Sequence, residues 1–89
     1  MNETATQEQG RQPRIKELVT YIAQSLVDKP EKVRVVQVER THSISLELTV
    51  DPNEMGKVIG RQGRIAKSLR ILVGAAAAKE GKKATLEIV

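Results

Sequence analysis

The stretch GKVIGRQGRI, residues 56–65, is the most informative part of this sequence. Its two central glycines, Gly60 and Gly63, stand three residues apart. Because glycine makes up about 7% of residues in proteins, chance alone gives roughly 0.4 such pairs in a chain of this length. The spacing by itself therefore indicates only a turn between two helices. A more specific interpretation depends on the flanking residues.

Both sides of this stretch carry helical signals. Residues 51–53 (DPN) break an upstream strand and can cap a short helix over residues 54–59. A longer helix is predicted from residue 64 to about residue 80, and Gly81 suits the left-handed position that closes a helix. Its inward positions are apolar and helically spaced: Ile65, Leu69, Leu72, Val73 and Ala76.

The rest of the chain predicts one more helix and three strands. The first helix begins at Pro13 and ends before residues 28–30 (DKP). Its apolar stripe consists of Ile15, Leu18, Val19, Ile22 and Leu26. Valine-rich or alternating patterns predict strands over residues 32–40, 43–50 and 83–89. The order α-β-β-α-α-β is typical of an α+β fold with helices on one face of a three-stranded sheet.

The glycine loop has the residues of a phosphate site. Its glycines let a ligand's backbone come close to the main chain, and the following helix N-terminus carries free N–H groups and partial positive charge. Arg61 and Gln62 project from the tip, and Lys57 and Arg64 flank it. The apolar residues beside this charged rim are Val58, Ile59 and Ile65. Such a site holds phosphates with main chain and cations while bases lie on aliphatic side chains.

Charge is unevenly distributed along the chain. The net charge is +4, from 15 basic and 11 acidic residues. Residues 55–78 contain no acid and five cations, which are Lys57, Arg61, Arg64, Lys67 and Arg70. A local positive field of this kind attracts a polyanion. Lys67 and Arg70 either extend a phosphate track along the long helix or form its ordinary solvated face, and the sequence leaves both open.

Residues 58–65 (VIGRQGRI) resemble the I-G-x-x-G-x-x-I signature of KH domains, with Ile65 taken as its last apolar residue. The element order is similar to the type II, bacterial arrangement of that fold, whose sheet is mixed. The chain resembles the small single-domain KhpA family, above all over residues 51–73. The resemblance covers residues 14–89. It implies a single KH domain over residues 13–89 that binds single-stranded RNA in a groove about four nucleotides long.

Carried over residue by residue, the KH signature implies that residues 60–63 hold the RNA backbone and that Ile59 and Ile65 line the groove. The strand over residues 44–50 and the turn at residues 40–42 would form the opposite wall. The full set of expected RNA-binding residues is Lys57, Ile59, Gly60, Arg61, Gln62, Gly63, Arg64, Ile65 and Lys67.

The resemblance also implies partners and a role. It implies an RNA chaperone or post-transcriptional regulator that affects cell elongation and cell-wall homeostasis, and pairing with a larger KH-containing protein of the KhpB type. Independently, about 77 residues without a disulfide supply only roughly 3–5 kcal/mol of stability, which predicts a homodimer or a heterodimer. No cofactor, metal or small-molecule substrate is expected.

Other function classes lack their residues. The chain has no cysteine, and its one histidine, His42, stands in a predicted turn where an idle, exposed side chain is the simpler interpretation. Neither a nucleophile–base pair nor a metal site can be assembled, so the protein is not expected to be an enzyme. RNA-recognition motifs, OB-folds and cold-shock domains stack bases on aromatic side chains, and Tyr21 is the single aromatic here.

Two further expectations concern setting and rival function. Residues 1–12 are polar without an apolar period, which predicts a disordered tail. No apolar run approaches the roughly 18 residues of a membrane span and no signal-peptide pattern is present, so a cytoplasmic setting is expected.

The alternative function is a KH fold that works mainly as a protein-interaction or dimerisation module, or as a ribosome-associated assembly factor. Dependence of RNA binding on residues 60–63 separates the two.

Overall fold

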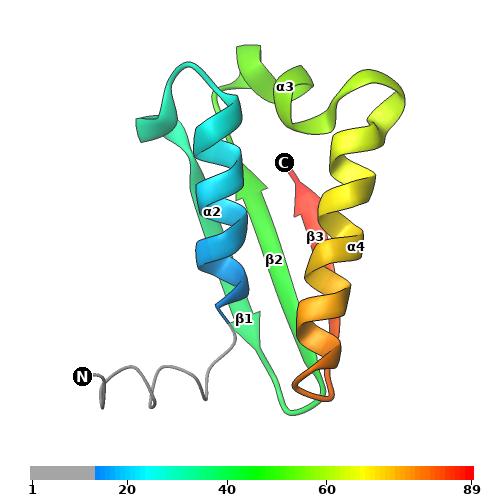
Figure 1. Cartoon of the computed structure of the whole chain (residues 1–89). Coiled ribbons are helices and arrows are strands. Elements are labelled where there is room, and N and C mark those ends of the chain that lie inside the picture. The colour runs from blue at the N-terminus through cyan, green and yellow to red at the C-terminus, as the bar shows by residue number, and fades with distance from the viewer. Residues whose placement is uncertain (1–13) are drawn as a thin grey trace, which may run out of the picture.

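A computed structural model describes residues 14–89 of the chain, with three α-helices and three strands in that range (Figure 1). The predicted order α-β-β-α-α-β is confirmed, whereas the tail predicted at residues 1–12 lies outside the described residues. The helices and strands are α2 (Ile15–Leu26), β1 (Arg34–Glu39), β2 (Ser43–Thr49), α3 (Met55–Ile59), α4 (Arg64–Ala78) and β3 (Lys83–Ile88). Short 3-10 turns occupy Pro30–Lys32, Pro52–Glu54 and Arg61–Gly63.

The sheet is mixed, as the resemblance implied. Its strand order is β1-β2-β3, with β1 antiparallel to β2 and β3 parallel to β2. Val35 pairs with Leu48 across the first ladder, and Leu46 pairs with Leu86 across the second. A parallel pair needs a crossover connection, which α3 and α4 provide. Helices α2 and α4 lie on the same face of the sheet, and the short helix α3 lies across one end of it (Figure 1).

The core lies between this sheet face and helices α2 and α4. Alternation along β2 directs Ile44, Leu46 and Leu48 inward, where each is at most 1% exposed. The helices contribute residues at helical spacing: Ile15, Val19 and Ala23 from α2, and Leu69, Val73 and Ala77 from α4. None of the helices in residues 14–89 is long and apolar enough to span a bilayer.

Two residues predicted to point inward lie at the margins of their stripes instead. Leu18 on α2 is 38% exposed and Leu72 on α4 is 48% exposed. Each lies at the edge of its buried stripe, because a helix buries only one side of its circumference. The prediction for Gly81 is confirmed: its φ is +71°, and the N–H of Lys82 donates to the carbonyl of Ala77 at the end of α4.

Candidate nucleic-acid interface

The connection between α3 and α4 requires glycine at two positions. Gly60 has φ 80° and ψ 171°, a backbone region that is essentially restricted to glycine. A Cβ added to Gly60 would lie 2.6 Å from Cγ1 of Ile65, which is closer than real Cβ contacts allow. Gly63 has φ 73° and ψ 15°, and no atom lies within 4 Å of its added Cβ. Gly60 is therefore needed for conformation and space, and Gly63 for conformation alone.

The tip of this loop is exposed and tightly turned. The N–H of Gly63 donates to the carbonyl of Gly60 at 3.0 Å, which closes the turn. Gln62 has φ 58°, and it is the only non-glycine residue with positive φ among residues 14–89. The side chains of Arg61 and Gln62 are both exposed. The structure thus places these two side chains at the loop tip, as the sequence predicted.

Helix α4 begins directly after this loop with no side-chain cap. Gly63 is its N-cap residue, and no side chain hydrogen-bonds the first turn. The first N–H groups of a helix have no partner within the helix, and with the helix dipole they favour a bound anion. The N–H groups of Gly63 and Arg64 donate to the carbonyls of Gly60 and Arg61, and the start of the 15-residue helix α4 beyond them has the main-chain geometry that suits an anion, with the glycines allowing close approach.

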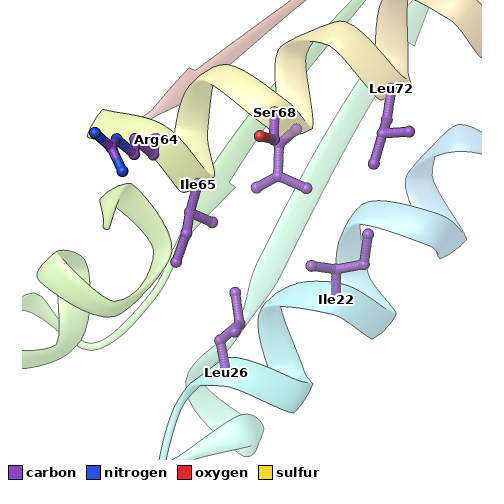
Figure 2. Close-up of a pocket in the computed structure, with 7 residues that line it drawn as sticks. Ile22, Leu26, Arg64, Ile65, Ser68 and Leu72 are labelled. Carbon is purple, nitrogen blue, oxygen red and sulfur yellow. The ribbon is translucent and has the colours of Figure 1, made fainter. Parts of the chain in front are cut away.

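Three unpaired cations surround this backbone site. Arg61, Arg64 and Lys67 are exposed, and within residues 14–89 none of them has an ion-pair partner. Arg64 and Lys67 lie three residues apart on α4, so they share one side of the helix. Figure 2 shows Arg64 directed outward from the first turn of α4. These side chains are available to neutralise phosphates along the loop and the first turns of α4.

Lys57 is placed differently from the other predicted cations. Its Nζ lies 2.6 Å from a carboxylate oxygen of Asp28 and 3.2 Å from one of Glu54. The hydrogen bond to Asp28, followed by the one to Glu54, raises the pKa of Lys57. Its charge is therefore matched within the protein, and the structure gives it a stabilising role beside the loop rather than a free cation.

Glu54 is a buried carboxylate beside the loop, and no motif in the sequence marks it. It accepts hydrogen bonds from the main-chain N–H groups of Asp28 (2.5 Å) and Lys29 (3.0 Å), in addition to its contact with Lys57. The Asp28 hydrogen bond is the main cause of the lowered pKa of Glu54. Glu54 thus ties the segment after α2 to the start of α3. In the sequence, the one indication of this role is the position of an acidic residue between the DPN turn and an apolar helix.

The apolar positions of the loop need one correction. Counted from Gly60, the last apolar position of I-G-x-x-G-x-x-I is residue 66, not residue 65. Ala66 is 4% exposed and belongs to the buried side of α4, whereas Ile65 and Ile59 are half-buried. Ile65 packs against Gly60. Ile59 and Ile65 therefore support the loop and leave part of their surface open to a ligand.

The wall expected opposite the loop is wrong in both its parts. Strand β2 lies between β1 and β3, so it is a central strand with no free edge. The turn at residues 40–42 lies at the far end of the molecule, where the carbonyl of His42 accepts from the N–H of Lys83 (Figure 1). The strand beside α4 is β3, and within residues 14–89 no other strand pairs with its outer edge. Pairing between distant segments, which the sequence pattern does not contain, decides this arrangement.

Two further residues of α4 lie beyond Lys67, and one of them contacts β3. Nε of Arg70 donates to the main-chain carbonyl of Leu86 at 3.1 Å. Ile71 is 64% exposed and lies one helical turn beyond Lys67. The sequence pattern leaves Arg70 open between a phosphate contact and a solvated helix face. It does not single out Ile71, although this isoleucine stands outside the inward stripe of α4.

A second feature of the molecule is an apolar groove between α2 and α4, on the other side of α4 from Arg70. Its volume is about 300 Å³. In Figure 2, Ile22 and Leu26 from α2 point towards Ile65 and Leu72 from α4. Ile65 also packs against Gly60, and Arg64 lines the groove as well, so the groove and the region of the glycine loop share these two side chains.

Comparison with known proteins places the chain among KH domains. The family model described as KhpA/KhpB, KH domain, matches residues 16–88. A protein of Clostridium perfringens called RNA-binding protein KhpA is 61% identical over 75 residues, which are 84% of this chain and 100% of that protein. Proteins with the same name from Halalkalibacterium halodurans and Aquifex aeolicus are 51% and 48% identical over 84% of this chain, and over 99% and 95% of their own lengths. No solved structure matched.

Proposed function

The chain belongs to the KhpA/KhpB family of KH domains, and from that premise we propose that it binds single-stranded RNA at the loop between α3 and α4. The observation that carries the proposal is the glycine loop itself, with an uncapped helix start behind it and unpaired Arg61, Arg64 and Lys67 around it. The glycines bring phosphates to the main chain, and the three cations neutralise them. The half-buried side chains of Ile59 and Ile65 support the bases.

Binding of this kind depends on salt and gains nothing from stacking of bases on aromatic side chains. Tyr21, the single aromatic of the chain, lies on α2, so no aromatic side chain stacks bases at the loop. If the three unpaired cations neutralise three phosphates, log affinity falls with log salt at a slope near −2, since each phosphate on a single strand contributes roughly −0.7. Fluorescence anisotropy of a labelled octanucleotide over a salt series measures this slope. A flat salt response contradicts the proposed site.

The decisive test replaces the loop tip and keeps both glycines. In the variant R61D/Q62D, two negative charges face the phosphate position and one positive charge is lost. Two unit charges about 4 Å apart near a protein surface interact by roughly 4 kcal/mol, and even a quarter of this value, about 1 kcal/mol, weakens binding more than fivefold. Folding is expected to persist because both side chains are exposed, and circular dichroism checks it.

A matched control changes the same net charge elsewhere. K16D/Q24D alters two exposed residues of α2 and also lowers the net charge by three, because lysine to aspartate removes two charges and glutamine to aspartate removes one. The control is expected to keep RNA affinity within about twofold at moderate salt. Unchanged affinity of the folded loop variant, or equal losses in both variants, rules out the loop as the RNA-binding site.

The apolar groove between α2 and α4 favours a second, compatible activity, which is self-association. The groove has Ile22, Leu26, Ile65 and Leu72 along it, and Leu18 adds exposed apolar surface on α2. A two-fold axis would place the same two helices of a second copy against this face, so apolar surface meets apolar surface in an isologous contact. A heterodimer with a KhpB-type protein through this face is the alternative outcome.

The wider roles follow from RNA binding in this proposal. We place the protein in the cytoplasm, as an RNA chaperone or post-transcriptional regulator with an effect on cell elongation and cell-wall homeostasis. Complementation of a deletion strain by the R61D/Q62D variant tests this dependence. Loss of complementation, with the variant folded and still self-associating, supports a role through RNA. Full complementation supports the rival hypothesis of a docking module.

A further inference from the structure

We propose that Arg70 selects bases that carry two adjacent hydrogen-bond acceptors, namely guanine through O6 and N7 or cytosine through O2 and N3. This inference rests on the proposed RNA binding and extends it from the phosphates to the bases. It starts from the hydrogen bond between Nε of Arg70 and the carbonyl of Leu86.

That hydrogen bond holds the guanidinium at the free edge of β3. In a parallel ladder, alternate residues direct both main-chain groups to the neighbouring strand. The N–H groups of Lys83 and Val89 reach His42 and Leu48 on the β2 side, so Leu86 directs its main-chain groups to the outer edge. A planar guanidinium fixed at one nitrogen keeps a defined orientation at this edge, whereas a free arginine on a solvated helix face does not.

The remaining donors of Arg70 match a particular pair of acceptors. With Nε engaged, the two Nη groups still carry N–H donors, and they form a planar fork. Guanine and cytosine each offer two neighbouring acceptors to such a fork. Adenine offers an acceptor next to an amino group, and uracil offers a carbonyl next to an N–H. In either base, one N–H donor of Arg70 would therefore face an N–H donor of the base. The fork therefore disfavours adenine and uracil.

The position of Arg70 suits a base of an RNA strand held at the glycine loop. Arg70 is seven residues after Gly63 on the same helix, which is about 10 Å along its axis. Lys67 lies between them, and exposed Ile71 lies beside Arg70. A KH groove holds about four nucleotides, so a strand whose phosphates contact the loop and Lys67 can place a base against Arg70.

The test measures base preference and salt dependence together. Uridine octamers with one central guanosine, cytidine or adenosine are compared by fluorescence anisotropy with wild type and with R70K, which keeps the charge and loses the fork. Wild type is expected to bind the guanosine or cytidine octamer at least roughly fivefold more tightly than the adenosine octamer. A fivefold ratio is the lower end of the discrimination that a bidentate contact to a base provides. R70K is expected to reduce this ratio below about twofold while keeping the salt slope.

Further measurements distinguish guanine from cytosine, and base selection by Arg70 from a purely structural role of this residue. Replacing the guanosine with 7-deazaguanosine removes the N7 acceptor. If the preference for the guanosine octamer is lost on this replacement, the selected base is guanine. If only the cytidine octamer is preferred, the selected base is cytosine. K67Q is the matched control, and it is expected to weaken all octamers equally and to retain the preference. R70Q, which loses both fork and charge, serves as a second variant in case R70K fails to fold.

Two outcomes overturn the inference without affecting the proposed function. In one, wild type binds all octamers equally in a salt-dependent, loop-dependent manner. In the other, folded R70K retains the preference and only its thermal stability falls, which assigns the Leu86 hydrogen bond a purely structural role. If no octamer binds, or R61D/Q62D binds like wild type, the proposed function itself fails.

Discussion

At the scale of single residues, Gly60 and Gly63 look equivalent in sequence but are under different constraints. An alanine at Gly63 has to adopt a left-handed conformation, which costs about 1–2 kcal/mol, and meets no other atom within 4 Å. An alanine at Gly60 has to adopt a region essentially restricted to glycine and also collides with Ile65. We expect G60A to lower the free energy of unfolding by about 2–4 kcal/mol, and G63A by less. Urea unfolding followed by circular dichroism measures both.

The collision with Ile65 can be tested separately from backbone strain. I65A removes the two atoms nearest to the added Cβ, Cγ1 and Cδ1. The penalty of G60A is expected to be smaller in the I65A background by about 1 kcal/mol, the size of coupling seen between contacting residues. Additive effects in this double-mutant cycle would mean that Ile65 moves aside freely and that the backbone conformation alone restricts position 60.

At the scale of elements, Glu54 connects the end of α2 to the start of α3, and this connection depends on pH. The pKa of Glu54 is lowered in the folded state, chiefly by the hydrogen bond from Asp28 N–H. A group with a lowered folded pKa stabilises the protein above its unfolded pKa and loses that contribution as the pH falls through the folded value. Stability is therefore expected to decline below the ordinary glutamate pKa of 4.5.

The variant E54Q measures this contribution. It is expected to be less stable than wild type at pH 7, and to lose less stability than wild type between pH 7 and pH 2. A residual acid dependence remains, because the hydrogen bond from Asn53 N–H lowers the pKa of Asp51 as well. Parallel pH profiles of urea midpoints for E54Q and wild type would contradict the role given to Glu54.

The same cluster predicts a clear difference between Lys57 and Lys67. Both are lysines near the glycine loop, but Lys57 is paired with Asp28 and Glu54, whereas Lys67 has no ion pair within residues 14–89. K57Q is expected to lower thermal stability and to change RNA affinity less than twofold. K67Q is expected to lower RNA affinity with a salt slope smaller in magnitude by about 0.7, and to leave stability unchanged. If K57Q weakens RNA binding and K67Q lowers thermal stability instead, Lys57 belongs to the RNA-binding site.

At the scale of the whole molecule, the chain is small and has an uncovered apolar face on α2 and α4. We expect sedimentation equilibrium at micromolar concentration to give twice the monomer mass of 9.8 kDa. L72D places a charge in the groove between α2 and α4 and is expected to give the monomer with RNA binding retained. I71D is the matched control on the next residue, which lies outside the groove. It is expected to keep the dimer and to weaken RNA binding, because it adds a negative charge beside Lys67 and Arg70.

Sequence alone determined the local features of this protein. The element order follows from apolar periodicity, and the loop follows from glycines at residues 60 and 63, where positive φ is needed. Both depend on interactions within a few residues, which a linear pattern contains. The absence of acids over residues 55–78 is equally local, and three of the cations in this range, Arg61, Arg64 and Lys67, are exposed without an ion pair within residues 14–89.

Which of these residues are available to a ligand depends on tertiary packing. Lys57 meets Asp28, 29 residues away, and Arg70 meets Leu86, 16 residues away. Strand β3, rather than β2, lies at the free edge beside α4. Leu72 stays exposed because the space between α2 and α4 is open at its position. Each outcome depends on how segments distant in sequence approach one another, and that approach is decided by the packing of the whole core rather than by the spacing of residues along the chain.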